Sequence, residues 1–150
     1  GPGEAAFAAA MMLGKKFTVL TMWPEWFPLY EKTLTEYGWW ERVASLRSIE
    51  TRPDVTELLA GKEEVIFDKL REEAMLAIEE DGADVIVLGS TTMHQSARYL
   101  ADNLPIPVLN PGQVAYKFLE TLIELGLTHS KKAFPAPEVP KDADIRKGWY

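Results

Sequence analysis

The sequence contains no cysteine, and this absence excludes several classes of chemistry. Without thiols the chain forms no disulfide, no cysteine-ligated zinc or iron–sulfur site, and no thiolate nucleophile. Histidine is also scarce, at 2 residues, which is too few to suggest a metal site in the absence of other clustered ligands. We therefore expect no bound metal.

An excess of positive charge and long apolar runs are missing as well. The chain has 16 Lys and Arg against 23 Asp and Glu, which gives a net charge of −7. Phosphate-rich partners need clustered basic side chains, so neither nucleic acid nor an anionic membrane is expected as a partner. No run of about 18 apolar residues occurs, and no basic leader precedes the apolar stretch Ala5–Leu13. These features predict a cytoplasmic protein without a membrane span or signal peptide.

The residues that are present are sufficient for one packed core. The chain has 150 residues, of which 47% are apolar and 11% aromatic. Short apolar runs at 17–22, 84–88 and 107–109 are typical of strands, and residues 43–49, with polar side chains interspersed, predict a more exposed edge strand. Helix-prone segments separate these strands. This alternation predicts parallel pairing with helices on both faces. We expect an α/β fold with a small doubly wound sheet of four strands in the order 2-1-3-4.

A proline-rich segment ends the chain. Pro135, Pro137 and Pro140 follow Gly126 and interrupt any regular element. We therefore expect an α/β lobe over residues 1–126. An extended arm over residues 127–150 would lie on a surface without adding to the core.

The predicted topology places a binding site. In open parallel sheets, ligands bind beyond the carboxyl ends of the strands where the strand order reverses. Here that point lies between Thr21–Trp23 and Gly89–Thr92. Glycine permits close approach to the backbone, and the following amides and hydroxyls at a helix start suit a carboxylate or a small phosphate. Serine and threonine are equally typical helix caps, so both interpretations stay open.

Other polar residues have simpler interpretations. No G-x-S-x-G elbow surrounds Ser90, and no acid partner for a catalytic triad is evident. His94 follows Ser90 by about one helical turn and could contact the loop, although a capping or surface role explains it as well. The acidic runs 63–64, 72–73 and 79–81 have the pattern of solvated helix faces.

Residues 82–94 (GADVIVLGSTTMH) resemble the sequence around the second catalytic cysteine of the aspartate/glutamate/hydantoin racemase superfamily. Other segments match its hydantoin-racemase-like branch in order, namely Gly1–Ala6, Phe17–Trp23, Ile106–Gly112 and Leu125–Thr128. The resemblance implies one lobe of a pseudo-symmetric, two-lobed, cofactor-independent enzyme. Such an enzyme moves the α-proton of a small amino acid, carboxylate or hydantoin. The chain matches the second lobe, so we expect either a sister lobe outside this chain or a homo-oligomer.

The resemblance also assigns roles to individual residues. It places Ser90, the catalytic candidate, where the family has its second-lobe cysteine, and it makes Thr91 and Thr92 donors to the substrate. It places the residues that end the first strand on the wall of the cleft. The predicted substrate-binding residues, all near the two strand ends, are Thr21, Trp23, Gly89, Thr91, Thr92 and His94.

A serine at the cysteine position changes the expected chemistry. A thiol with a pKa of about 8.5 becomes a base with modest tuning, whereas a hydroxyl is a far weaker acid that needs a neighbouring base. Racemisation by two thiols is therefore not expected of this chain. Two alternatives stay open. One is a non-catalytic anion-binding or oligomerisation module, and the other is a flavodoxin-like nucleotide or flavin binder, because a fold alone does not assign function.

Overall fold

The structure is a computed structural model that describes residues 1–54, 56 and 62–136. The chain divides into two compact units, residues 1–118 and 119–150. This division falls inside the last helix. The lobe boundary expected from the sequence follows that helix and stays a prediction.

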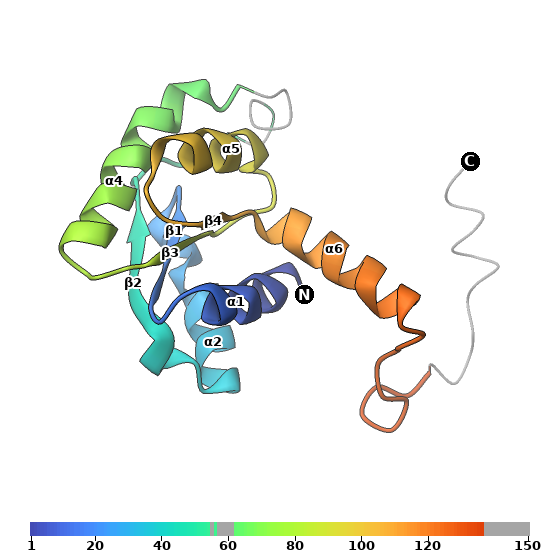
Figure 1. The fold of residues 1–150 in the computed structure, drawn as a ribbon. Coiled ribbons are helices and arrows are strands. Elements are labelled where there is room, and N and C mark those ends of the chain that lie inside the picture. The colour runs from blue at the N-terminus through green and yellow to red at the C-terminus, as the bar shows by residue number, and fades with distance from the viewer. Residues whose placement is uncertain (55, 57–61, 137–150) are drawn as a thin grey trace. The chain divides into compact units, whose positions relative to one another are not determined.

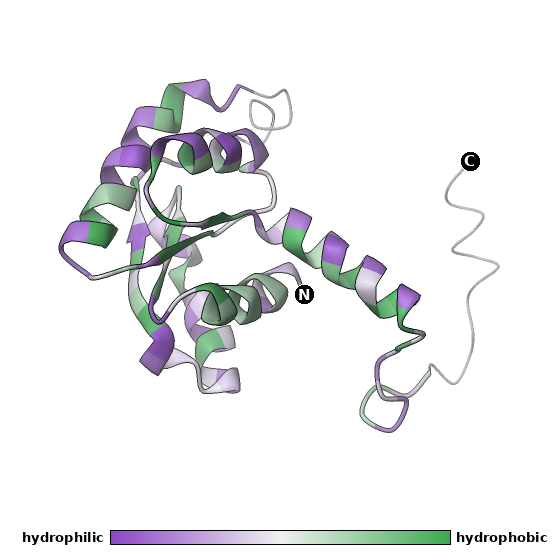
Figure 2. Cartoon of the chain, viewed as in Figure 1, coloured by the Kyte–Doolittle hydropathy of each residue, from purple (hydrophilic) through white to green (hydrophobic). Residues whose placement is uncertain are grey.

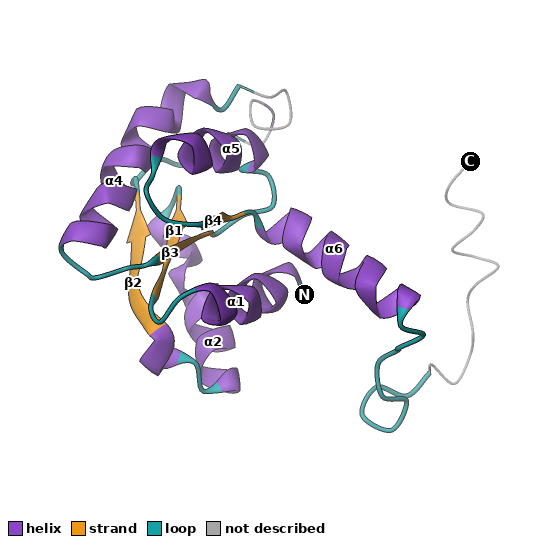
Figure 3. Ribbon diagram, viewed as in Figure 1, coloured by secondary structure: helices purple, strands orange, loops and turns teal. Residues whose placement is uncertain are grey.

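A parallel sheet forms the centre of the first unit. Its 4 strands lie in the order β2-β1-β3-β4 (Figures 1 and 3). They are β1 (Phe17–Thr21), β2 (Val43–Ser48), β3 (Val85–Leu88) and β4 (Val108–Leu109). The two central strands are buried along their whole length because helices cover both faces of a parallel sheet, whereas the edge strands are half-buried. The predicted α/β class and strand order are confirmed.

The helices that accompany the sheet are α1 (Pro2–Leu13), α2 (Phe27–Tyr37), α4 (Phe67–Glu79), α5 (His94–Asn103) and α6 (Pro111–Glu124). A 3₁₀ turn over Glu64–Ile66 precedes α4. In Figure 2, α4 alternates between purple and green along its length, as expected of an amphipathic helix. Among the described residues, no helix combines the length and apolar character needed to cross a bilayer.

Alternate residues of the central strands enter two separate cores, because successive side chains of a strand point to opposite faces. Val19 and Val87 pack with α1 and α2 on one face of the sheet. Leu20 and Leu88 pack with α4 and α5 on the other. Figure 1 shows the same division, with α1 and α2 on one side of the sheet and α4 and α5 on the other. The strand ends at the reversal point are therefore held from both faces.

The described part of the second unit, residues 119–136, contains the end of α6 followed by irregular backbone. The backbone turns at Ser130–Phe134, where the Phe134 amide donates to the Ser130 carbonyl at 2.8 Å. All of residues 127–136 are exposed. The expected extended arm therefore contains a turn, and residues 137–150 of that arm lie outside the described residues.

One arginine of the edge strand β2 joins the sheet to the end of α4. Nε of Arg47 donates to Oδ2 of Asp81 at 2.5 Å, and Nη2 donates to Oδ1 at 3.0 Å. Nη1 also donates to a carboxylate oxygen of Glu73 at 3.1 Å. The expectation that these acidic residues only face solvent is wrong, because they pair with a strand residue remote in sequence.

Replacing Asp81 with Asn tests this contact. The hydrogen bond from Arg47 holds the pKa of Asp81 below its ordinary value, and partial burial opposes the shift. A lowered pKa stabilises the fold above the ordinary value of about 4, and this contribution is lost as pH falls through the folded-state pKa. We expect D81N to lower the free energy of unfolding by about 1 kcal/mol at pH 7, and by less at pH 3, in urea titrations.

Glu79, an exposed residue near the end of the same helix, provides the control. We expect E79Q to change the free energy of unfolding by less than about 0.5 kcal/mol at either pH. A D81N loss of equal size at both pH values would contradict the assignment.

Candidate functional site

A cavity of about 290 Å³ lies at the carboxyl end of β3, where the strand order reverses. We name it the strand-end cavity. Its walls come from α1, α2, the end of β3 with the following loop, and the start of α6. The lining residues, none of them charged, are Pro2, Gly3, Phe7, Tyr30, Leu88, Gly89, Ser90, Thr91 and Pro111.

Two adjacent residues of the cavity lining, Ser90 and Thr91, have backbone amides without a hydrogen-bond acceptor in the described residues. The Gly89 amide donates to the Leu20 carbonyl at 2.8 Å, and the Thr92 amide donates to Oγ of Ser90 at 3.3 Å. Between them, the amides of Ser90 and Thr91 donate no hydrogen bond within the described residues. Backbone N–H groups require partners, so this pair is a candidate contact for a carbonyl or carboxylate oxygen.

Gly89 lies where no side chain fits. The Tyr30 hydroxyl donates to the Gly89 carbonyl at 2.9 Å and is in hydrogen-bond contact with Oγ1 of Thr21 at 3.1 Å. A Cβ on Gly89 would collide with the Tyr30 hydroxyl and would lie 2.8 Å from both Cβ and Oγ1 of Thr21. Burial raises the pKa of Tyr30 above its usual value, and the Thr21 hydrogen bond opposes the rise. Tyr30 is therefore a neutral phenol that ties the ends of β1 and β3 together.

The predicted residues at the end of β1 are not part of the cavity lining. Thr21 is fully buried and reaches the cavity wall only through Tyr30. The Trp23 ring lies 5.5 Å from the guanidinium carbon of Arg52, measured to the ring centroid. Neither Thr21 nor Trp23 lines the strand-end cavity. A direct substrate contact by either residue stays a prediction.

The Ser90 hydroxyl organises its own loop. Oγ of Ser90 lies 2.8 Å from Oγ1 of Thr92 in addition to accepting from the Thr92 amide. The Ser90 carbonyl accepts from the Met93 amide at 3.4 Å. In the part of the chain that the structure describes, no carboxylate, amine or imidazole is in hydrogen-bond contact with Ser90 Oγ. The lobe therefore shows no general base that would activate this hydroxyl.

The first turn of α5 already holds a carboxylate. Glu63 is fully buried, and its Oε2 accepts from the Ser96 amide at 2.8 Å and from Ser96 Oγ at 2.6 Å. Oε1 accepts from the Gln95 amide at 3.2 Å. Met93 precedes α5 and provides no side-chain cap. A Ser or Thr side-chain cap therefore does not take this place, and the solvated position expected for Glu63 is wrong.

His94 lies next to this carboxylate, outside the strand-end cavity. Its side chain is 59% exposed, and its Nδ1 is 3.3 Å from Oε1 of Glu63. The same nitrogen lies 3.3 Å from the Thr92 carbonyl oxygen. Of the seven predicted site residues, the structure thus brings Gly89, Ser90 and Thr91 together in one cavity, and the other four do not line it.

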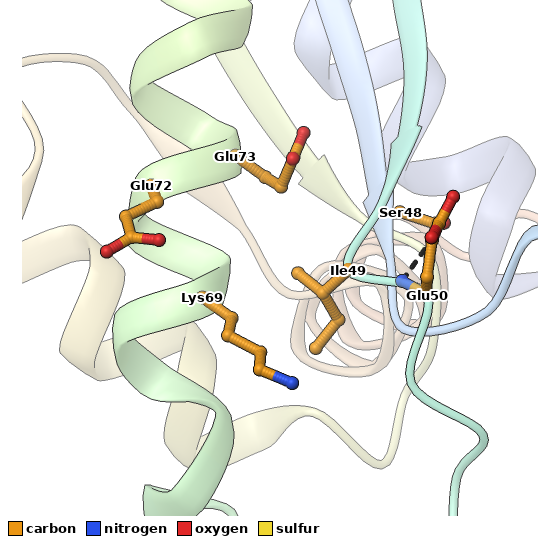
Figure 4. A pocket seen from close by; sticks show the side chains of 6 residues that line it. All are labelled: Ser48, Ile49, Glu50, Lys69, Glu72 and Glu73. Atoms are coloured by element: carbon orange, nitrogen blue, oxygen red, sulfur yellow. Dashed lines mark hydrogen bonds between the residues drawn. The ribbon is translucent and has the colours of Figure 1, made fainter.

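A second cavity of about 370 Å³ lies between the end of β2 and α4 (Figure 4). Its lining residues are Ser48, Ile49, Glu50, Lys69, Glu72 and Glu73. Three of the charged residues are acidic, and no group of His, Asp and Glu among the described residues is arranged to hold a metal ion. The strand-end cavity, in contrast, is lined by the predicted site residues Gly89, Ser90 and Thr91, and it is therefore the candidate site.

Replacing Gly89 with Ala tests the close approach at the cavity wall. The added methyl group must displace Tyr30 or Thr21, so we expect the free energy of unfolding to fall by about 1–3 kcal/mol. Gly3→Ala is the matched control. Its Cβ would meet only Phe7, at 3.9 Å, and a helical Gly-to-Ala change stabilises by about 0.5–1 kcal/mol. Equal effects of the two changes in thermal or urea unfolding would refute the packing described here.

Comparison with known proteins identifies the family. Residues 1–119 match the Asp/Glu/Hydantoin racemase family. The chain is 34% identical over 139 residues to a hydantoin racemase of Pseudomonas sp. strain NS671, an alignment that covers 92% of this chain and 55% of that protein. It is 30% identical over 132 residues to a hydantoin racemase of Paenarthrobacter aurescens, covering 87% of this chain and 54% of the relative. The chain thus spans about half the length of these curated relatives.

Solved structures agree with this match. An allantoin racemase from Klebsiella pneumoniae superposes with a TM-score of 0.82 at 33% identity, covering 93% of this chain and 56% of that one. An allantoin racemase from Pseudomonas fluorescens gives a TM-score of 0.80 at 32% identity, with 93% and 59% covered. The resemblance found in residues 82–94 is therefore confirmed by sequence and fold together, and this chain belongs to the Asp/Glu/hydantoin racemase family.

Proposed function

We propose that this chain is one lobe of a cofactor-independent racemase or isomerase, and that its strand-end cavity is half of a site for a hydantoin-type cyclic amide. One observation carries the proposal. Ser90 and Thr91 line an uncharged cavity, and their backbone amides donate no hydrogen bond within the described residues. The hydantoin and allantoin racemases that the chain matches support it. Because the chain spans about half their length, a second lobe would supply the other half of the site.

The cavity lining favours a neutral ring over a free carboxylate. The residues that line it include no lysine or arginine, and the chain as a whole carries a charge of −7. A carboxylate entering the cavity would lose hydration without a cation to compensate for it. A ring carbonyl needs only hydrogen-bond donors, which the Ser90 and Thr91 amides supply. Phe7 and Tyr30 add the aromatic wall that such small-molecule sites commonly use.

The amide pair would also stabilise the reacting form of such a ligand. When a base removes the proton from the ring carbon beside the carbonyl, the C–H electron pair moves toward that carbonyl and the oxygen becomes negative. Backbone donors aimed at this oxygen stabilise the charge as it develops. The base itself would come from the other lobe, because Ser90 is a hydroxyl without an activating partner in the described residues. Ser90 would then serve at most one face of the substrate.

A second candidate function rests on α6. Tyr116, Phe118, Leu119 and Ile123 of this helix are all more than half exposed. Contiguous exposed apolar side chains favour association with another chain. On this alternative the protein is a non-catalytic anion-binding or oligomerisation module, and its partner is a second copy or a sister lobe.

Titration of the ¹⁵N-labelled chain with hydantoin tests the proposed site. We expect the amide resonances of Ser90 and Thr91 to move most, and T91V to weaken the affinity about 2- to 10-fold by removing a hydroxyl at the cavity. Thr128→Val, in an exposed segment, should leave the affinity unchanged. Absence of loop shifts, together with a mass that rises with concentration in light scattering, would favour the assembly function.

Ser90→Cys tests whether this side chain meets the ligand. The chain has no other cysteine, so iodoacetamide would report on this position alone. We expect alkylation of S90C, and we expect hydantoin to slow it in proportion to the occupancy of the site. S130C, in an exposed turn, should react at the same rate with and without hydantoin. Failure of saturating hydantoin to protect S90C would place Ser90 outside the site.

A further inference from the structure

Glu63 is a buried acid whose partners lie at the start of α5, the helix that follows the cavity loop. Its side chain has no solvent exposure, and it accepts hydrogen bonds from both the Gln95 and Ser96 amides and from Ser96 Oγ. His94 Nδ1 lies 3.3 Å from the same carboxyl group. The Gln95 and Ser96 amides of the first turn therefore donate to Glu63 and are not open to an external anion.

The N-terminus of a helix carries a partial positive charge and attracts anions, an effect that falls off within the first turn. A carboxylate seated there opposes the attraction. The loop amides at the cavity lie close to this turn. The Met93 amide donates to the Ser90 carbonyl at 3.4 Å, and the Ala97 amide donates to the Met93 carbonyl at 3.1 Å. Two hydrogen bonds thus link the loop that carries Ser90 and Thr91 to the first turn of α5, where Glu63 is seated.

We infer that Glu63 determines ligand specificity: by filling the first turn of α5, its carboxylate excludes carboxylate-bearing ligands from the strand-end cavity and leaves the Ser90 and Thr91 amides to neutral cyclic amides. The inference rests on the proposed function of that cavity. Glu63 acts through the field and the loop, without touching the ligand. The Glu63 carboxylate thus acts in the same direction as the uncharged lining, which already favours neutral ligands over carboxylates.

Two probes of matched chemistry test the inference. Hydantoin is a neutral ring, and N-carbamoylglycine is its ring-opened carboxylate. We expect the wild-type chain to bind hydantoin more tightly than N-carbamoylglycine, as followed by the Ser90 and Thr91 amide shifts. In E63Q we expect the affinity for N-carbamoylglycine to rise at least about threefold, because the opposing charge is gone, with the hydantoin affinity unchanged within about twofold.

Two variants separate charge from structure. E64Q removes the same charge from an exposed neighbour and should leave both affinities as in the wild type. S96A removes one hydrogen bond from Glu63 but keeps its charge, so it should not admit the carboxylate. A gain shared by E64Q or S96A, or no gain in E63Q, would overturn the inference. If E63Q does not fold, wild-type affinities that are equal for the two probes would overturn it as well.

The outcomes distinguish this inference from the proposed function. A wild-type chain that binds hydantoin, with an E63Q variant that gains nothing for N-carbamoylglycine, would refute the role of Glu63 and support the site. A chain that binds hydantoin in no variant would refute the proposed site. A selective gain of N-carbamoylglycine binding in E63Q would still support the role of Glu63.

Discussion

The hydrogen bond from the Tyr30 hydroxyl to the Gly89 carbonyl is the contact on which the site depends. Tyr30 is buried and needs an acceptor, and the carbonyl at the end of β3 provides one at 2.9 Å. This contact requires a glycine, because a Cβ would collide with the same hydroxyl and with Thr21. With the carbonyl held, the chain turns so that Ser90 and Thr91 line the cavity. The contact that packs the two strand ends together therefore also positions the two residues whose backbone amides are proposed to bind the ligand.

The distribution of charge around the strand-end cavity is the second constraint on its ligand. The strand-end cavity has no charged lining residue, and the nearby start of α5 is filled by Glu63 from within the chain. Both features oppose a second carboxylate. The hydroxyl of Ser90 sits on the same loop with only Thr92 in hydrogen-bond contact among the described residues, so the lobe is better equipped to hold a ligand than to take its proton.

The sequence predicted what short-range patterns determine. Apolar runs and their alternation with helices predicted the four-stranded sheet and its order, and Gly89 between a strand and a helix predicted the loop at the reversal point. Contacts between remote residues were not predictable in this way. Glu63 meets Ser96 across 33 positions, and Tyr30 meets Gly89 across 59. No spacing rule links such partners, so the acidic pattern alone predicted a solvated position for Glu63.

The chain belongs to a family and spans about half the length of the members compared with it, so its own contribution must be measured on this chain itself. A crystal structure of the chain with hydantoin is the most direct measurement of the central claim. We predict a ring carbonyl oxygen within hydrogen-bond distance of the Ser90 and Thr91 amides, with the ring beside Phe7 and Tyr30. A ring bound in the cavity between β2 and α4, or a strand-end cavity closed by side chains at saturating hydantoin, would contradict the account.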